Sequence, residues 1–372
     1  MSECGFLFAV VYHGGGNCSM IAFFPEVYPD ELVYSWLARY GVRSGYTHYR
    51  AIADDLFTSH IAKPNPEFVM ELSLDAYEVI TDAMPFESVI MQHTMFPYYA
   101  RFLPIERRQK AFGQLLDMDK GFINTLYIRR NKTQHRQWLR YCPLCAESDR
   151  KQYGEAYWHR QHQLDHINIC PVHGCYLQNS TISVTSKDSP SLTHAELEIP
   201  DSFSPVFCQN PLERQVAAYV AEVFSADIAM DNPVTIGSFM HHKLEYTKYL
   251  TPRGQKRNLA LLTDDFNDFY RTLPHSILTE HWQLEKIFSN YRCHTYDICL
   301  LAMFLGTSVA ELLKMKLPEK SQAQLFDEEI IWLHDNGLNY RQISQKLGAS
   351  YDYCKLAAKR YRIAQQQETL LL

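Results

Sequence analysis

Apolar residues recur at helical spacing through most of the chain, and short helices are the elements that this pattern predicts. Near the N-terminus, residues 28–46 place Leu32 and Trp36 on one face, with Asp30 at the expected start of the helix. A second short helix is predicted over residues 47–57. Two short helices with a glycine-containing joint are typical of a helix-turn-helix-like unit, although any helical bundle shows a similar pattern.

The helical spacing is clearest at the C-terminal end, where three short helices are predicted between Asp327 and Ile363. Ile331 and Leu333 lie on the first of these helices, and Gly337 ends it. A DNA-binding helix-turn-helix needs a supporting helix, a tight turn and a last helix with a basic face; a purely structural three-helix bundle is the alternative. The residues that we predict to contact DNA from the last helix are Lys355, Lys359 and Arg360.

Changes in composition between the two ends indicate how the chain divides into domains. Residues 179–206 are rich in Ser, Thr and Pro, which favours a linker, and helical periodicity resumes after them. The expected fold class is mainly α, with modular helical domains and helix-turn-helix units. We expect a disordered leader over 1–19, a first domain over 20–178, the linker over 179–206, a helical domain over 207–318 and the C-terminal helix-turn-helix over 319–372.

Composition limits the classes of protein that this chain can represent. Hydrophobic residues make up 46% of it, but no stretch approaches the roughly 20 apolar residues of a membrane span, so a soluble protein with no membrane contact is expected. The formal net charge is −6. Nucleic-acid contact therefore has to come from local basic patches on a slightly acidic body.

Two such patches are present. One covers residues 337–363, with six Lys/Arg against one Asp, and the other covers residues 129–140, with five Lys/Arg and no acid. A solvated helix face would have the same composition, and it is the alternative to a DNA contact. The residues of the second patch that we predict to touch the phosphate backbone are Arg129, Arg130, Lys132, Arg136 and Arg140.

Cysteine and histidine are concentrated between residues 140 and 178. Zinc takes four tetrahedral nitrogen or sulfur ligands, and a CxxC turn presents two sulfurs to one ion. Cys142 and Cys145 form such a pair, and after 24 intervening residues Cys170 and His173 form a second pair. The spacing predicts a closed Cys3His site, that is, a zinc-finger module with a structural Zn²⁺ embedded in the first domain.

Other chemistries fit this segment less well. A thioredoxin-like CxxC needs a preceding strand and a long following helix, whereas a basic run and a turn-like stretch flank Cys142 and Cys145. A disulfide needs an oxidising compartment, which the sequence does not indicate. A hydrolytic zinc, as in an HNH-like nuclease, needs an open coordination position and a general base, and four good ligands would close this one.

Two features near the predicted ligands leave alternatives open. Cys175 lies two residues after His173 and is an alternative fourth ligand. His159, His162 and His166 recur at i, i+3 and i+7, the spacing of one helical face, which favours a packed or phosphate-facing stripe over metal ligation.

The chain resembles the TniQ/TnsD family, the target-selection proteins of bacterial transposons with heteromeric transposases. The resemblance covers residues 25–180 and is carried, in order, by "YPDELVYSWLARYG", "HTMFPYYARFLPIERRQ" and "YCPLCAESDRKQYGEAYWHRQHQLDHINICPVHGCYL". It implies that the family's zinc ligands fall on Cys142, Cys145, Cys170 and His173. Cys175 departs from the family pattern, which more often has a non-ligand there.

The resemblance also implies a function. Family members do not cut DNA; they mark where insertion occurs, by binding a chromosomal site or by docking on a CRISPR effector such as Cascade with its guide RNA, and they recruit an AAA+ ATPase regulator that brings the transposase. We therefore expect no enzyme activity, a place in the bacterial cytoplasm at the nucleoid, and target DNA, the ATPase and Cascade as partners, with a homodimer as a further expectation. A zinc-containing helix-turn-helix transcription regulator is the alternative, although a simple repressor does not need the zinc block.

Overall fold

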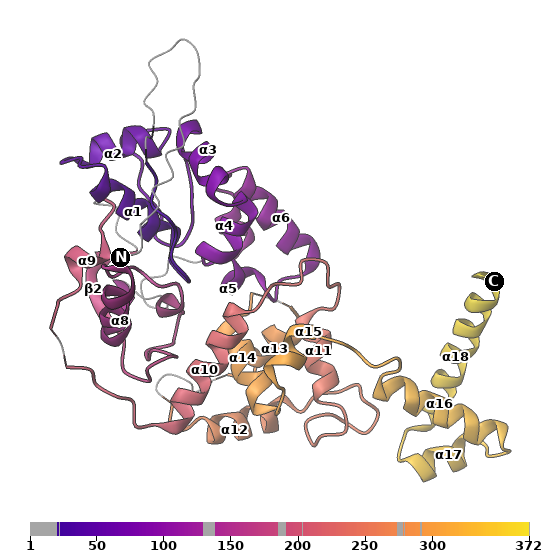
Figure 1. The fold of residues 1–372 in the computed structure, drawn as a ribbon. Helices are drawn as coiled ribbons and strands as arrows, with labels where there is room; N and C mark the ends of the chain where they lie inside the picture. Colours follow the sequence, from indigo (N-terminus) through magenta and orange to yellow (C-terminus); the bar gives the residue numbers. More distant parts are fainter. Residues whose placement is uncertain are drawn as a thin grey trace. The chain divides into compact units, whose positions relative to one another are not determined.

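The structure, a computed structural model, describes most of the chain (Figure 1). The described residues are 21, 23–128, 138–184, 191–202, 204–273, 278, 280–290 and 292–371, with side chains as far as Tyr361. The predicted leader lies outside them, as do four of the basic residues predicted to contact DNA: Arg129, Arg130, Lys132 and Arg136. No helix in the described part is long and apolar enough to cross a membrane.

Two compact units divide the chain. The first comprises the described residues up to Pro233 together with His294–Met303, and the second comprises Val234–Cys293 and Phe304–Leu372. The chain therefore leaves the first unit after Pro233, returns to it for one helix and leaves it again. This division places the predicted boundary at residue 206 inside the first unit.

The mainly α fold predicted from the sequence is confirmed, since helices dominate both units and the described strands form one two-stranded sheet. The elements of the first unit are α1 (Val33–Arg43), α2 (Tyr49–Leu56), α3 (Leu74–Ala83), α4 (Phe86–His93), α5 (Phe96–Ala100), α6 (Ile105–Leu116), α7 (Phe122–Thr125), β1 (Trp138–Tyr141), α8 (Pro143–Tyr153), η1 (Gln161–Gln163), β2 (Gln178–Ser183), α9 (Ala195–Glu198), α10 (Pro211–Ser225) and most of α14 (Thr295–Phe304).

The second unit is helical throughout its described residues. Its elements are α11 (Ile236–Lys243), α12 (Leu259–Phe269), α13 (Trp282–Phe288), α15 (Val309–Lys314), α16 (Gln322–Asp335), α17 (Tyr340–Leu347) and α18 (Tyr351–Leu371).

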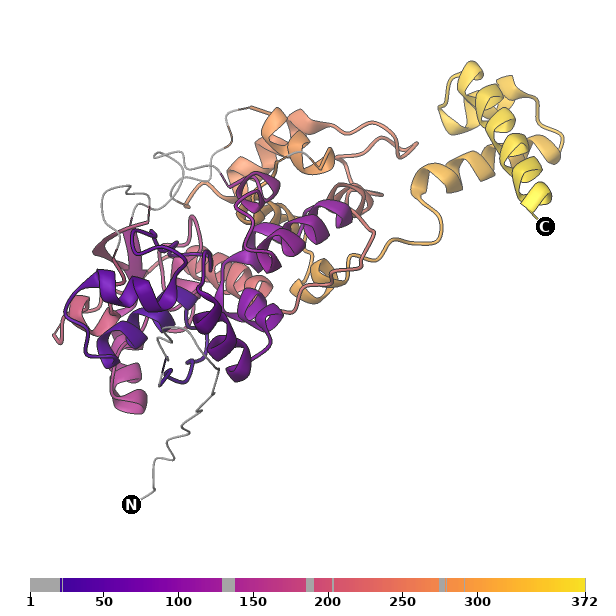
Figure 2. The same cartoon turned by 90° about the horizontal axis from the view of Figure 1, so that it is seen from above.

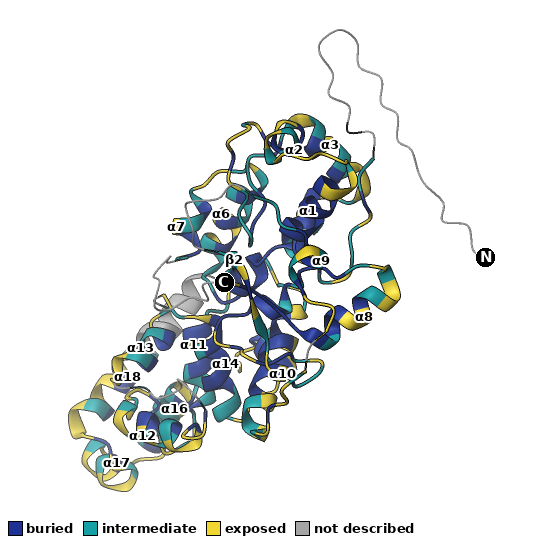
Figure 3. Cartoon of the chain, turned by 90° about the vertical axis from the view of Figure 1, so that its left-hand side faces the viewer, coloured by how far each residue is buried: buried dark blue, intermediate teal, exposed yellow. Residues whose placement is uncertain are grey.

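Helix α1 lies in the core of the first unit, and its residues from Val33 to Gly41 are all buried (Figure 3). The helix begins at Val33 rather than at Asp30, because Asp30 has a left-handed backbone with φ 55° and forms part of the preceding turn. Trp36 is fully buried. Burial of a side chain of this size contributes about 2–3 kcal/mol to the free energy of unfolding.

A buried arginine on α1 is neutralised by two carboxylates. Arg39 is only 1% exposed, and its guanidinium lies 2.9 Å from Glu31 and 2.8 Å from Glu155. Glu155 follows α8, more than a hundred residues later in the chain. Because an unpaired charge at this depth would be strongly destabilising, the three side chains fix α1 against the segment after α8.

The segment predicted as a linker contains two ordered elements. β2 pairs antiparallel with β1, with Arg140 opposite Asn179. α9 follows, and its Glu196 accepts two hydrogen bonds from the Nε of Arg150 on α8, at 3.0 and 2.9 Å. The Ser/Thr-rich composition therefore does not mark a free linker here, because the strand hydrogen bonds and this ion pair hold the segment to the first unit.

Helix α14 explains why residues 294–303 belong to the first unit. Nearly all its side chains are apolar, and the buried ones, among them Ile298 and Leu301, lie all round the helix. The hydroxyl of Thr295 donates a hydrogen bond to the carbonyl oxygen of Tyr98. A helix that is apolar on every side needs a core around it, and the first unit supplies that core.

The C-terminal helices α16–α18 form the three-helix arrangement predicted from the sequence (Figure 2). Gly337 and Gly348 both adopt positive φ, 92° and 62°, in the turns that follow α16 and α17. Ile330 is fully buried, whereas the neighbouring Ile331, which lies on this helix as predicted, is only half-buried. The buried cluster consists of Ile330, Leu333, Ile343, Ala349, Cys354 and Ala357.

Candidate metal centre

The first pair of predicted ligands lies where β1 passes into α8. Cys142 is the N-cap residue of α8, and the backbone N–H of Cys145 donates to its Sγ at 3.4 Å. Pro143 occupies the first turn, where its missing N–H costs no hydrogen bond. The turn is thereby fixed so that both sulfurs, which are buried, lie on one side of it.

The second pair repeats this geometry in a tight loop. The backbone N–H of His173 donates to the Sγ of Cys170 at 3.4 Å, and the N–H of Cys170 donates to the carbonyl of Cys175 at 2.8 Å. Gly174 has φ 67°, a conformation that favours glycine at this position. The loop returns the chain antiparallel to itself and turns the His173 imidazole towards the first pair of cysteines.

The four predicted ligands come together as one cluster. Their donor atoms all lie within 4.8 Å of one another. The Nδ1 of His173 is 3.5 Å from the Sγ of Cys142, 3.3 Å from that of Cys145 and 3.7 Å from that of Cys170. A tetrahedral zinc with Zn–S of about 2.3 Å and Zn–N of about 2.0 Å requires S···N and S···S separations of about 3.5 and 3.8 Å.

This donor set fits zinc in chemistry as well as in size. Three thiolates and an imidazole suit Zn²⁺ better than the hard, oxygen-preferring cations Mg²⁺ and Ca²⁺. When bound, the ion would cross-link the two loops through four protein ligands, and a four-coordinate site has no position left for a substrate. The cluster is therefore compatible with the structural zinc predicted from the sequence.

Two further side chains touch this cluster. The Sγ of Cys175 lies 3.4 Å from that of Cys142, and the Nε2 of His162 lies 3.8 Å from the Sγ of Cys170. Both are buried. Neither belongs to the group of four mutually close donors, in which His173 is the fourth member.

The three histidines expected on one helical face do not share one. Helical structure in this described segment is limited to the short 3-10 helix η1, so the i, i+3, i+7 spacing does not place all three on one face, although the rings of His159 and His162 pack 4.7 Å apart between centroids. His159 bonds to Asp149, His162 faces Cys170, and the ring of His166 packs on Tyr296, 5.1 Å away between centroids. A phosphate-facing stripe is therefore not formed by these residues.

Arg140 is built into the metal module rather than exposed at its surface. Its guanidinium donates to the carbonyl oxygens of Ile167 at 2.7 Å and Leu164 at 2.6 Å, and the residue is 6% exposed. This placement contradicts the predicted phosphate contact from Arg140. The basic residue instead holds the loop that leads into Cys170.

Gln163 supports the same loop, and nothing in the sequence pattern singled it out. Its Nε2 donates to the carbonyl of Arg140 at 2.8 Å, and its Oε1 accepts from the N–H of Arg140 at 3.1 Å. The side chain thus pairs with the main chain of β1 as a neighbouring strand would. From the sequence alone, a buried glutamine with this role cannot be distinguished from a surface glutamine.

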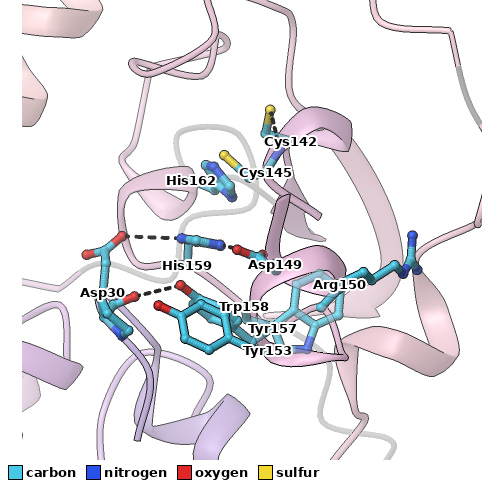
Figure 4. A network of polar contacts seen from close by, with 12 residues as sticks. Asp30, Cys142, Cys145, Asp149, Arg150, Tyr153, Tyr157, Trp158, His159 and His162 are labelled. Atoms are coloured by element: carbon cyan, nitrogen blue, oxygen red, sulfur yellow. Dashed lines mark hydrogen bonds and ion pairs between the residues drawn. The ribbon is translucent and has the colours of Figure 1, made fainter. Parts of the chain in front are cut away.

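A buried polar network ties the metal module to the turn before α1 (Figure 4). His159 lies 2.8 Å from Asp149 on α8 and 4.0 Å from Asp30. Asp30 also accepts from Arg160 at 3.1 Å and from the backbone N–H of Gln161 at 3.0 Å. Burial acts to lower the pKa of His159, but the hydrogen bond and charge of Asp149 outweigh it and raise that pKa. Asp30 therefore serves as a fixed anion for this network rather than as a helix start.

The first unit is thus a helical domain with two knuckles whose four donor atoms could hold a metal ion, and comparisons with known proteins show what this domain resembles. Residues 22–177 match the TniQ family model. The chain is 30% identical over 159 residues to the transposon Tn7 transposition protein TnsD of Escherichia coli, an alignment that covers 41% of this chain and 30% of TnsD. The TniQ/TnsD resemblance is confirmed over these residues. The chain aligns with less than a third of its curated relative's length.

The three basic residues predicted on the last helix lie on α18, but they differ in their surroundings. Lys355 and Lys359 are exposed and make no ion pair among the described residues. Arg360 lies 2.8 Å from Asp327 of α16, and its guanidinium stacks on the ring of Tyr353, 5.2 Å from the centroid. The two lysines are available to a ligand, whereas Arg360 is already neutralised.

Proposed function

We propose that this protein selects insertion sites for a Tn7-like transposon with a heteromeric transposase. In this role it holds target DNA, recruits an AAA+ ATPase regulator and, through that regulator, the transposase, and it works on the bacterial chromosome. The observation that carries the proposal is the Cys3His cluster inside a segment that matches TniQ and is 30% identical to TnsD. The role of the metal is to hold the domain in shape.

In the proposed role, the protein is an adaptor and catalyses no reaction. A closed four-ligand site offers no position for a metal-bound water, and a hydrolytic zinc would need one. His162, the remaining candidate base near the cluster, is buried and faces Cys170. We expect no nicking or cleavage of DNA with Mg²⁺, Mn²⁺ or Zn²⁺; reproducible cleavage that is lost in His162→Ala would support a nuclease instead.

The proposed DNA contact is made by α18. Its buried residues, Cys354, Ala357 and Ala358, face the bundle, and the opposite face carries Lys355 and Lys359. Two lysines one helical turn apart on an exposed face suit the backbone phosphates of a duplex. We expect Arg360 to contribute less to DNA binding, because its guanidinium would first have to break the ion pair with Asp327.

A binding titration tests this contact. Lys355→Gln/Lys359→Gln removes two exposed charges that have no ion-pair partner in the described part of the chain, so the fold should be unchanged. Each lost phosphate contact should reduce the slope of log affinity against log salt by about 0.9. The matched control is Lys151→Gln on α8, whose ammonium already pairs with Glu147 at 2.5 Å. Unchanged affinity and slope in the double variant would overturn the contact.

Two alternative functions predict different results for the double variant. A docking surface for a CRISPR effector predicts that the double variant binds duplex DNA as the wild type does but loses a guide-loaded Cascade. A transcription regulator predicts DNA binding without any effect on transposition. Transposition reconstituted from the ATPase and the transposase, with and without this protein, distinguishes target selection from transcription regulation. A target-selection protein is required for insertion at the target, whereas a transcription regulator is not.

A further inference from the structure

A short basic hairpin lies against the C-terminal three-helix bundle. Leu250 and Arg257 pair as an isolated antiparallel bridge, and the N–H of Thr251 donates to the carbonyl of Lys256 at 3.0 Å. The turn is closed by Gly254, whose N–H donates to Thr251 at 2.7 Å. Residues 250–257, named the basic hairpin from here on, include three basic residues and no acid.

The basic hairpin is anchored to α16 through its backbone. A Cβ at Gly254 would lie 2.8 Å from the backbone nitrogen of Ala323, and Gly254 has φ 69°, so a residue with a side chain fits poorly there. The side-chain amide of the buried Gln322 donates to the carbonyl of Pro252 at 2.9 Å. The tip of the hairpin is therefore held at the start of α16, not free in solvent.

A second set of contacts joins the basic hairpin to α18. Gln255 donates to the hydroxyl of Tyr353 at 2.8 Å, and the guanidinium of Arg253 lies 4.9 Å from the Tyr353 ring centroid. Arg253 also donates to the carbonyl of Gly348, the residue that ends α17, at 3.4 Å. Tyr353 lies on α18, the helix that also carries the half-exposed Leu356 and the exposed lysines Lys355 and Lys359.

The charges of the basic hairpin are not matched by protein carboxylates at its tip. Arg257 at its base pairs with Glu285 at 2.8 Å, and Lys248, just before it, pairs with Asp265 at 2.5 Å. Lys256 is exposed, and neither it nor Arg253 has an ion-pair partner among the described residues. Arg253 and Lys256 therefore add two cations beside the bundle whose last helix carries the exposed Lys355 and Lys359.

We propose that the basic hairpin is a second DNA-contacting element, which places Arg253 and Lys256 on the phosphate backbone next to the duplex segment held by α18. The inference rests on the proposed DNA contact of α18 and adds a separate set of phosphates to it. Base edges are not its target, because the guanidinium of Arg253 is already oriented by the carbonyl of Gly348 and the ring of Tyr353, and Lys256 offers only a point charge. The hairpin should therefore strengthen binding to every duplex equally.

The variant that tests the hairpin is Lys256→Gln, which removes an exposed charge that has no ion pair among the residues that the structure describes. Its matched control is Lys248→Gln, the same change of charge eight residues earlier at a lysine already paired with Asp265. Fluorescence anisotropy on several duplexes between 50 and 300 mM salt gives the affinity and the salt slope. One lost phosphate contact should lower the slope by about 0.9, and should weaken binding about eightfold at 0.1 M salt, by the same factor on each sequence.

The possible results separate this inference from the proposed function. A reduced slope in Lys256→Gln but not in Lys248→Gln supports the hairpin. A wild-type slope in Lys256→Gln, when Lys355→Gln/Lys359→Gln is weakened, overturns the hairpin and leaves the α18 contact standing. A sequence-dependent loss in Lys256→Gln overturns the phosphate assignment. No duplex binding by the wild-type protein defeats the proposed DNA contact and the hairpin with it.

Discussion

The metal module and the C-terminal three-helix bundle are held together by different means. Around the metal ligands, the buried cluster consists of cysteines, with the half-buried Leu144 and Leu177 beside it. In the bundle, the cluster is mainly aliphatic, and α16 and α17 begin with reciprocal capping boxes at Ser321 and Asn339. With zinc bound, the first region would depend on ligand bonds, whereas the second depends on apolar burial and local capping.

This difference indicates which substitutions should destabilise each region most. A module whose centre is thiolate and imidazole gains its folding free energy when the metal binds, so loss of one ligand removes most of it at once. A bundle with a distributed apolar core loses stability in increments, one side chain at a time. Four changes test this contrast, beginning with the largest expected effect.

The largest effect is expected for Cys142→Ser. Removing one of four ligands should release the zinc and unfold the segment around the two knuckles, because structural zinc contributes about 10–16 kcal/mol of apparent binding free energy in small modules. Metal analysis and limited proteolysis of the purified chain measure both results. Cys175→Ser is the matched control, since it changes a buried thiol next to Cys142 but outside the four mutually close donors.

The outcome for Cys175 also decides the fourth ligand. If His173 binds the metal, Cys175→Ser should keep one zinc per chain. Loss of zinc in Cys175→Ser together with retention in His173→Ala would contradict the assignment of His173. A wild-type chain purified without any zinc would remove the basis of the whole metal centre.

Leu333→Ala should have the next largest effect, confined to the bundle. Leu333 is 2% exposed, and truncating a buried leucine leaves a cavity that costs about 2–4 kcal/mol of unfolding free energy. Zinc content should stay at the wild-type value. Chemical denaturation followed by circular dichroism provides the measurement, with Leu325→Ala, which is 44% exposed, as the control expected within about 0.5 kcal/mol of wild type. Equal destabilisation by both variants would argue against the apolar core.

A smaller effect, with a defined pH dependence, is expected at Glu31. Burial raises the pKa of this carboxyl to about 7, although Arg39 acts in the opposite direction. Its contribution to stability is therefore complete below the unfolded pKa of 4.5 and is lost as the pH rises through about 7. Glu31→Gln, which mimics the protonated form, should lose less stability than the wild type between pH 5 and 8.

Thermal melting of both proteins across this pH range tests the sign. The control is Glu147→Gln, since Glu147 is exposed on α8 and paired only with Lys151. A Tm difference between wild type and Glu31→Gln that does not change between pH 5 and 8 would show that Glu31 does not titrate there.

The smallest effect is expected for Asn339→Ala in the bundle. The Asn339 side chain accepts from the backbone N–H groups of Arg341 and Gln342 at 3.0 and 3.1 Å, so the change removes the cap of α17 and costs about 1 kcal/mol. Asn339→Asp keeps the acceptor oxygen and should retain most of the stability. Equal losses in the two variants would mean that the cap contributes nothing measurable.

Much of this contrast could be predicted from the sequence, because its signals are local. The CxxC and CxxH spacings predicted the four clustered donors, and the helix–glycine–helix pattern predicted α16–α18 with a turn at Gly337. Local spacing is sufficient in both cases, since the ligands of each knuckle and the caps of each helix are near neighbours in the chain.

The sequence could not predict contacts that join distant segments. Arg140 was expected at the surface because it ends a basic run, yet two carbonyl oxygens from residues 164 and 167 hold it inside. Asp30 resembled a helix cap, yet its partners come about 130 residues later. The polar pairing of the basic hairpin with α16 and α18 depends likewise on tertiary contacts, and charge counting alone does not reveal it.

The return of α14 to the first unit has a consequence for how the chain can be divided or exchanged. A fragment that stops at Pro233 contains the whole segment that matches TniQ but lacks the helix whose buried residues, Ile298 and Leu301 among them, complete the core of that unit. Such a fragment would expose the apolar core residues that α14 covers and would tend to aggregate. A chimaera that gives this domain a different C-terminal module therefore has to keep the chain intact through Met303, so that recombination between relatives is restricted to the segment beyond it.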